Sequence, residues 1–149
     1  MSALALNKRA GFDYEILKTF EAGLVLSGSE VKAIRDHQIS LKGAYITLSQ
    51  GEAWLINAHI GAYKKAGNLK DYDPTRSRKL LIHKKELNKL IGTLHSKGLT
   101  LVPVSVYTKG RRLKLELGVA RGKKKYEKRE LIKQRDVDRE IRAKMKIRG

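Results

Sequence analysis

The chain has no cysteine, which excludes disulfide bonds and thiolate-bound metal sites. No apolar run approaches the ~20 residues that a membrane-spanning helix requires. The first ten residues, MSALALNKRA, lack the long apolar region of a secretory signal peptide. We therefore expect a soluble protein that works in the cytoplasm and does not bind a membrane.

The common motifs of catalysis and of cofactor binding are also missing. There is no P-loop, no G-x-S-x-G sequence and no dinucleotide-binding fingerprint. The four histidines lie far apart, without an H-x-x-x-H pair, and the carboxylates of the first 120 residues are scattered. We expect no metal, no cofactor, and histidines that lie at the surface or cap a helix. The protein is therefore not expected to be an enzyme, and a nuclease site assembled from dispersed residues is the distant alternative.

Positive charge is what the chain has in excess. It contains 33 Lys and Arg against 15 Asp and Glu, a net charge of +18. Residues 121–149 hold 13 basic and 5 acidic residues, 13 − 5 = +8, so the preceding 120 residues carry the other +10. So large an excess resists compaction unless a polyanion is close. Nucleic acid is the favoured polyanion, because binding its phosphates releases counterions.

The first 120 residues predict one domain with several short strands and two helices. Ser27 and Glu30 form a capping box that starts a short helix ending near His37. Leucines and isoleucine at i, i+3, i+4 and i+7 predict a second helix over residues 83–96, which Gly98 stops. Alternating or apolar runs predict strands at residues 12–26, 44–48, 53–56, 80–82, 99–107 and 113–120.

These elements contain no βαβ alternation, which argues against a doubly wound sheet. They indicate a mainly β fold, a small antiparallel OB-like barrel with helices on its surface. Gly23 lies inside the first strand and marks a bulge or a close approach of another group. Trp54, the only tryptophan, is expected in the core. Residues 60–75 are expected to form a long loop.

Residues 121–149 are expected to behave differently from the rest. Val137, Ile141 and Met145 recur at i, i+4 and i+8, which gives only a narrow apolar stripe on a helix. Such a stripe cannot offset the entropy of ordering the segment alone. We expect a basic tail that is disordered when free and helical against a polyanion, joined to the body through Gly122. The alternative is a solvated end that only aids solubility.

Basic clusters alternate with tyrosines along the chain. Tyr63, Tyr72, Tyr107 and Tyr126 fall in or beside such clusters. Arginine and tyrosine together suit RNA, whose unstacked bases lie on aromatic or guanidinium planes.

Four motifs resemble small protein B, the family of bacterial tmRNA-binding proteins. They are LNKRA (6–10), FEAGLVLSGSEVKAIR (20–35), DPTRSRKLL (73–81) and GVARGKKKYEKR (118–129), and they span nearly the whole chain. The resemblance implies an OB-like barrel that binds the tRNA-like domain of tmRNA and brings it to stalled ribosomes. It also implies a tail, unstructured in solution, that enters the empty mRNA channel as a helix. A general RNA chaperone or ribosomal-type RNA-binding protein is the alternative, and we expect a monomer.

The resemblance also implies individual roles. Residues matching the family's RNA-binding positions are Asn7, Glu21, Leu81 and Lys114. Charge alone adds Lys8, Arg9, Arg35, Arg78 and Lys79. Positions matching the ribosomal decoding-site tail are Tyr126, Glu127, Lys128 and Arg129, with Gly122, Lys123 and Lys124 as the hinge. A carboxylate such as Glu21 at an RNA site either accepts hydrogen bonds from base amino groups or holds a basic neighbour in place.

Overall fold

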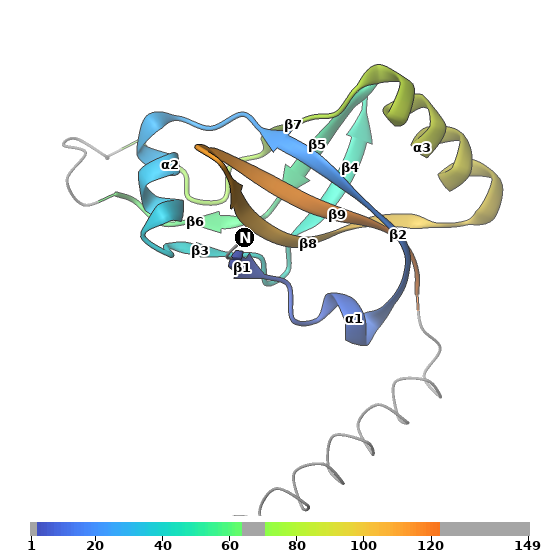
Figure 1. Cartoon of the computed structure of the whole chain (residues 1–149), viewed down its shortest axis with the longest axis horizontal. Helices are drawn as coiled ribbons and strands as arrows, with labels where there is room; N and C mark the ends of the chain where they lie inside the picture. The colour runs from blue at the N-terminus through green and yellow to red at the C-terminus, as the bar shows by residue number, and fades with distance from the viewer. Residues whose placement is uncertain (1–2, 64–70, 123–149) are drawn as a thin grey trace, which may run out of the picture.

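The computed structural model describes residues 3–63 and 71–122, a mainly antiparallel β structure with three helices (Figure 1). The elements are β1 (Ala3–Leu6), α1 (Ala10–Asp13), β2 (Tyr14–Leu24), α2 (Gly28–Arg35), β3 (Ile39–Ser40), β4 (Tyr45–Ser49), β5 (Glu52–Ile56), β6 (His59–Ile60), β7 (Arg78–Leu81), α3 (Lys84–Lys97), β8 (Thr100–Lys109) and β9 (Arg112–Gly122).

Seven strands form one antiparallel sheet in the order β1-β8-β9-β2-β7-β5-β4, and β3 pairs with β6. The long strands β2, β8 and β9 lie side by side and carry most of this sheet (Figure 1). The strands predicted from the apolar pattern are all present. The first of these strands, β2, begins two residues later than predicted, because residues 12 and 13 belong to α1. The short β1, β3 and β6 were not predicted, since two to four residues carry too little periodicity.

The two predicted helices are confirmed. At α2 the Glu30 backbone N–H donates to Ser27 Oγ at 3.2 Å, and the Ser27 N–H donates to Glu30 Oε1 at 3.0 Å, which is the predicted capping box. α3 ends where expected, since Gly98 takes the left-handed conformation at φ 62°. Leu87 and Leu90 of α3 are buried.

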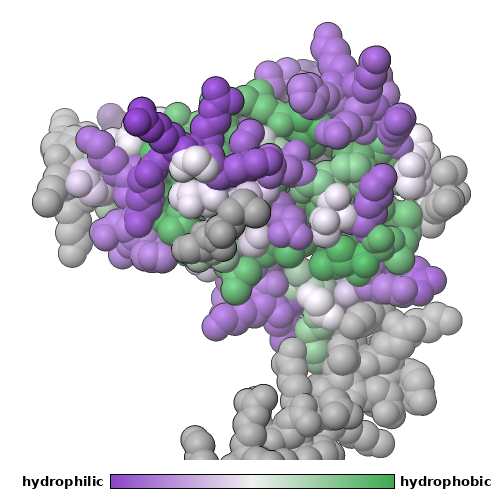
Figure 2. Space-filling model, in the orientation of Figure 1, coloured by the Kyte–Doolittle hydropathy of each residue, from purple (hydrophilic) through white to green (hydrophobic). Residues whose placement is uncertain are grey.

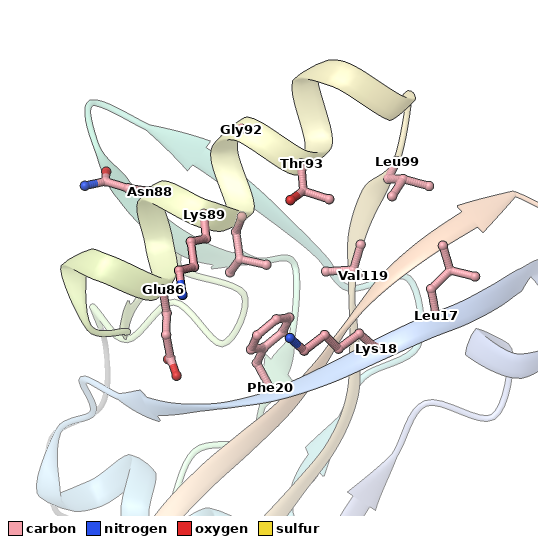
Figure 3. A pocket seen from close by; sticks show the side chains of 11 residues that line it. Leu17, Lys18, Phe20, Glu86, Asn88, Lys89, Gly92, Thr93, Leu99 and Val119 are labelled. Carbon is pink, nitrogen blue, oxygen red and sulfur yellow. The ribbon is translucent and has the colours of Figure 1, made fainter.

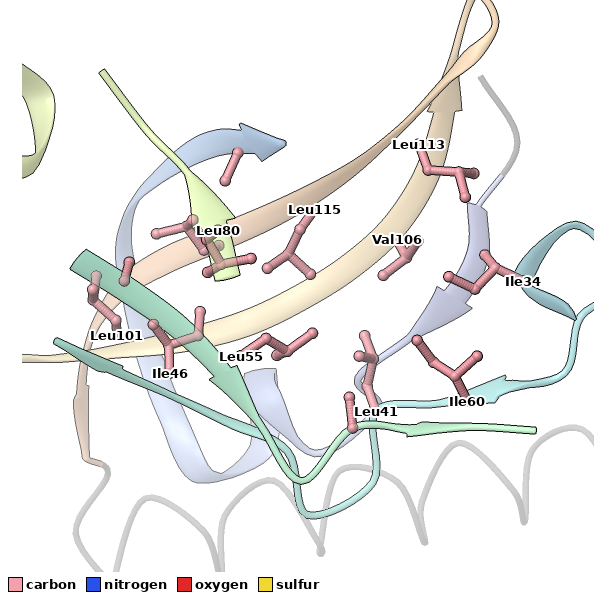
Figure 4. Packing of buried hydrophobic residues seen from close by; sticks show 14 of the residues in the cluster. Ile34, Leu41, Ile46, Leu55, Ile60, Leu80, Leu101, Val106, Leu113 and Leu115 are labelled. Atoms are coloured by element: carbon pink, nitrogen blue, oxygen red, sulfur yellow. The ribbon is translucent and has the colours of Figure 1, made fainter. Parts of the chain in front are cut away.

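The core lies between strands of the sheet, where side chains of α2 and α3 join it, and it consists almost entirely of aliphatic side chains (Figure 4). Trp54 is not part of it, contrary to expectation, and is half-buried. Its neighbours Ala53 and Leu55 are 2% and 1% exposed, so the two-residue period of β5 points them inward. That period puts Trp54 on the outer face, opposite Lys79.

The last described strand extends past the predicted end of the body. β9 continues to Gly122, which pairs with Tyr14, and Arg121 pairs with Glu15 in register and through an ion pair. β9 thus includes Arg121 and Gly122, the first two residues of the predicted tail. The predictions for the tail itself fall on residues 123–149, outside the described residues. No helix within the described ranges is both long enough and apolar enough to cross a membrane.

Candidate nucleic-acid interface

Four of the predicted RNA-binding residues lie in one groove. It has a volume of about 1160 Å³ and runs between the ends of β2, β7 and β9 and the first turn of α3. Glu21, Lys79, Leu81 and Lys114 line it, although they come from three separate strands. The antiparallel pairing of β2 with β7 and β9 is what brings these residues together.

A cross-strand row forms the outer face of the sheet at this groove. Tyr107 of β8 pairs with Lys114 of β9, Lys114 with Gly23 of β2, and Gly23 with Leu81 of β7. Directly paired residues project on the same face of a sheet. Leu81 is 55% exposed, so a large apolar side chain lies open to solvent beside a lysine.

Glu21 lies two residues before Gly23 and hence on the same face. Tyr107 donates a short hydrogen bond to Glu21 Oε2, and Lys109 Nζ lies 3.3 Å from Oε1. The Tyr107 hydrogen bond and the nearby lysines hold the pKa of the Glu21 carboxyl below its usual range. Burial and the contact with Glu21 raise the pKa of the Tyr107 hydroxyl, which stays a donor at neutral pH. Glu21 therefore holds Tyr107 and Lys109 in place at this edge of the groove.

The other predicted basic residues are more dispersed. Lys79 lines the groove and pairs with Glu52 at 2.9 Å. Arg35, at the end of α2, donates to the Arg111 carbonyl at 2.7 Å and so lies against the β8–β9 turn. Arg112, which follows Arg111 in the chain, lines the groove, so Arg35 lies near the end of the groove.

Asn7, Lys8 and Arg9 are not part of this groove. They connect β1 to α1, on the side of the molecule away from α3 (Figure 1). The Asn7 side-chain amide donates to the Pro103 carbonyl at 2.8 Å, which ties the segment to β8. Arg9 contacts Asp13 at 3.4 Å and lies over the Phe12 ring at 4.7 Å.

Arg78, predicted on the RNA face from charge alone, lies inside the fold. Its side chain is fully buried at 0% exposure, so it is inaccessible to RNA in the folded protein. Its guanidinium donates to Glu30 Oε2 at 2.8 Å, to the Ala58 carbonyl at 2.7 Å and to the Pro74 carbonyl at 2.9 Å. Arg78 therefore stabilises the fold by tying α2 to the segment before β7.

Glu30 is the buried carboxylate that pairs with Arg78, and together with Arg76 and Tyr72 these residues form a polar cluster. It accepts hydrogen bonds from Arg76 and Arg78 besides its capping bond with Ser27. Burial opposes ionisation of this carboxyl, but the donors from Arg76, Ser27 and Arg78 outweigh it and lower the pKa to about 2. Tyr72, expected beside RNA, instead donates to the Ile60 carbonyl at 2.8 Å and accepts from Arg78 at 3.2 Å. No local pattern indicates these contacts, because Glu30 lies 42 to 48 residues from Tyr72, Arg76 and Arg78 in the chain.

The groove also has lining residues that were not predicted as site residues. They include Gly23, Lys84 and Arg112, and Tyr107 and Lys109 adjoin Glu21. Lys109 and Arg112 belong to the basic run at residues 109–114, and Tyr107 lies beside that run, so the charge pattern could have found them. The tail positions Lys123, Lys124, Tyr126, Glu127, Lys128 and Arg129 lie outside the described residues.

A second hollow of about 700 Å³ lies between β2 and α3 (Figure 3). Leu17, Phe20, Leu99 and Val119 give it an apolar lining, and Lys18 extends along the Phe20 ring at 4.9 Å. None of the predicted RNA-binding residues lines this hollow.

Hydrophilic side chains project from the surface over α2 and α3, with apolar atoms between them (Figure 2). All four histidines are exposed, as expected, and His83 is the N-cap residue of α3. Across residues 3–63 and 71–122, no group of three or more histidine or acidic side chains is placed to hold a metal ion.

Comparison with known proteins agrees with the sequence motifs. A family model described as SmpB protein matches residues 4–147. The chain is 50% identical over 149 residues to the SsrA-binding protein of Coprothermobacter proteolyticus, covering 99% of both chains. It is 47% identical over 148 residues to the SsrA-binding protein of Chloroflexus aggregans, covering 99% of this chain and 94% of the relative.

A solved structure gives the same assignment. It is described as "tmRNA-SmpB: a journey to the center of the bacterial ribosome", and one of its chains is 47% identical to this chain. The two superpose with a TM-score of 0.65 over 80% of this chain and 84% of the other. This chain belongs to the SmpB protein family.

Proposed function

We propose that this protein is an RNA-binding adaptor that binds the tRNA-like domain of tmRNA and delivers it to stalled ribosomes. The observation that carries the proposal is the groove in which Glu21, Lys79, Leu81 and Lys114 converge from three strands. Family membership supplies the RNA and the ribosome as partners, since relatives are SsrA-binding proteins and a similar chain was solved with tmRNA on the ribosome.

The groove offers the contacts that a folded RNA needs. Lys79, Lys114 and Arg112 bring positive charge to bind phosphates. Leu81 offers an apolar surface, and Glu21 fixes Tyr107 and Lys109 beside it. Such a surface recognises RNA by shape and unstacked bases in addition to charge. The protein acts by positioning its RNA and contributes no catalytic residue.

The sheet is proposed to be an OB-like barrel. β4 is one edge of the seven-stranded sheet and β8 is next to the other edge, yet these two strands lie in contact. That contact curves the sheet back on itself, as closure of a small barrel requires. Work on the ribosome would place the protein in the cytoplasm.

The basic end of the chain is proposed to act on the ribosome. The decoding region would be contacted by Tyr126, Glu127, Lys128 and Arg129, with Gly122, Lys123 and Lys124 as the hinge. The remainder would form a helix in the empty mRNA channel and replace codon–anticodon pairing. The +8 charge of residues 121–149 suits a channel walled by ribosomal RNA.

Loss of one groove lysine tests the RNA-binding face. With six to ten phosphate contacts, affinity for the tRNA-like domain should fall about 10³- to 10⁵-fold between 50 and 200 mM salt. Lys114→Ala should weaken binding and reduce the salt slope by about 1, because it removes one phosphate contact.

Lys42→Ala is the matched control, since Lys42 is an exposed lysine outside the groove and its loss changes the net charge equally. Fluorescence titration of labelled RNA at several salt concentrations measures both variants. Equal affinities and slopes for the two variants would show that only overall charge matters and would remove the groove from the binding face.

A further inference from the structure

The turn between β8 and β9 concentrates positive charge at the tip of a long hairpin. Four of the six residues from 109 to 114 are basic: Lys109, Arg111, Arg112 and Lys114. Only Gly110 and Arg111 connect the strands, because Lys109 and Arg112 are already paired in the ladder. Gly110 has φ 63°, as the first residue of such a tight turn requires. Hairpin tips are mobile unless they are tied down, and the like charges at this tip repel one another.

Two contacts from outside the hairpin hold this turn. On one side, Lys109 pairs with Glu21 of β2 at 3.3 Å. On the other side, Arg35 Nη2 donates to the Arg111 carbonyl at 2.7 Å, across 76 positions of the chain. This carbonyl lies in the turn, outside the β8–β9 ladder, so a donor from another element can satisfy it. Because the donor is a cation, the hydrogen bond is stronger than one between neutral groups.

Arg35 donates from a helix whose position is fixed. It is the last residue of α2, which lies beside the tip of the hairpin (Figure 1). The two preceding residues, Ala33 and Ile34, are buried in the core. Near the start of the helix, Glu30 pairs with the buried Arg78. Both ends of α2 are therefore anchored, so its last side chain can restrain a mobile turn.

Charge alone predicts that Arg35 contacts RNA directly, but the structure gives its guanidinium another partner. Arg35 lies outside the set of residues that line the groove, whereas Arg112, next to the carbonyl that Arg35 binds, belongs to that set. A turn that is ordered before RNA arrives brings its cations to the phosphates without the cost of ordering them during binding.

We propose that Arg35 is a positioning residue, which holds the β8–β9 turn so that Lys109 and Arg112 face the bound RNA. The inference rests on the proposed RNA-binding function and gives α2 a part in it. Arg35 acts through the backbone of the turn and makes no phosphate contact of its own.

Direct contact and positioning differ in how substitutions combine. If Arg35 binds a phosphate itself, the loss from Arg35→Ala is independent of the turn, so it adds to the loss from replacing Lys109 and Arg112 by alanine. If Arg35 acts through the turn, its effect depends on the charges that it positions. Arg35→Ala should then cost little further affinity in the variant that already carries Lys109→Ala and Arg112→Ala.

The first measurement uses the free, full-length protein and needs no RNA. Amide hydrogen exchange at residues 109–112 should be about 3- to 10-fold faster in Arg35→Ala, the range expected for loss of one exposed hydrogen bond. Lys32→Ala is the matched control, since Lys32 is an exposed lysine of the same helix and its loss changes the net charge equally. Exchange at the turn between β4 and β5 should stay unchanged in both variants.

The second measurement is titration of the tRNA-like domain of tmRNA at fixed salt. Arg35→Ala should weaken binding about 3- to 10-fold relative to Lys32→Ala, with the same thermal melting midpoint for the two variants. In the variant with Lys109→Ala and Arg112→Ala, the further loss on adding Arg35→Ala should fall below about 2-fold.

The outcomes separate positioning from the general function. Native exchange at the turn in Arg35→Ala, an affinity equal to that of Lys32→Ala, or losses that add in the triple variant would each overturn the positioning role. Selective binding of tmRNA by the native protein would then still support the proposed function. Absence of that binding would remove the function, and the positioning role with it.

Discussion

Deletion of residues 123–149 will leave binding to the tRNA-like domain nearly intact and will abolish tagging of a stalled nascent chain. The strands of the described fold lie within residues 3–122, and β9 pairs with β2 up to Gly122. The groove lies wholly within the body, so the RNA-binding face is retained. In the proposed function the basic end enters the ribosomal decoding region and mRNA channel, so we expect tagging to be lost. Tagging in a reconstituted translation system measures the second effect and RNA titration the first.

A charge-neutral substitution separates helix formation from charge in this segment. Ile141→Pro should impair tagging, because proline costs a helix about 3 kcal/mol and leaves the charge unchanged. Ile141→Ala is the control, since it shortens the same side chain and keeps helix propensity. If the truncated protein tags at the native rate, the segment is only a solubility device.

Removal of Glu30 will have the largest effect on stability. Glu30→Ala leaves Arg78 buried without its carboxylate partner, and an uncompensated buried charge typically costs about 3–5 kcal/mol. The variant also loses the capping box of α2. Glu52→Ala is the control: it removes an ion pair whose side chains are 39% and 42% exposed, and such pairs contribute about 1 kcal/mol or less. Urea unfolding measures both, and similar losses would contradict a structural role for the cluster.

Lowering the pH should destabilise the native protein, because its stability depends on the ionised Glu30 carboxylate. The pKa of Glu30 is lowered in the fold, from 4.5 to about 2. A carboxyl with a lowered pKa stabilises the fold fully above its unfolded pKa and loses that contribution as the pH falls. About 3 kcal/mol should therefore disappear between pH 4.5 and pH 2. Glu30→Gln should unfold with a shallower dependence over this range, and an equal slope would assign the acid sensitivity to other carboxyls.

Local patterns predicted the elements, and long-range pairing decided which residues share a site. The capping box of α2 and the leucine spacing of α3 were correct because they depend only on residues within a few positions. The groove depends on strand order, which composition does not reveal, because it brings together Glu21, Lys79, Leu81 and Lys114. Only the family resemblance indicated that three of them, Glu21, Leu81 and Lys114, act together.

The placements expected for Arg78 and Trp54 differ from the structure because the strand that holds each residue was considered without its two faces. Arg78 and Lys79 are adjacent basic residues, and the local sequence gives no reason to distinguish them. Arg78 is nevertheless buried, whereas Lys79 lies in the groove. Successive residues of a strand face opposite ways. The inward position tolerates arginine because the distant Glu30, with the Ala58 and Pro74 carbonyls, accepts its hydrogen bonds. Trp54 was misplaced because its hydrophobicity was considered without the period of its strand.

Selective binding of tmRNA is tested most directly by recovering the native protein from a bacterial lysate at physiological salt and sequencing the bound RNA. Lys114→Ala, recovered in parallel, serves as the weakened control. One species, tmRNA, should dominate the RNA bound to the native protein far beyond its share of the lysate and should decrease with the variant. A broad population of RNAs recovered in proportion to abundance would contradict the claim and would indicate a general RNA chaperone.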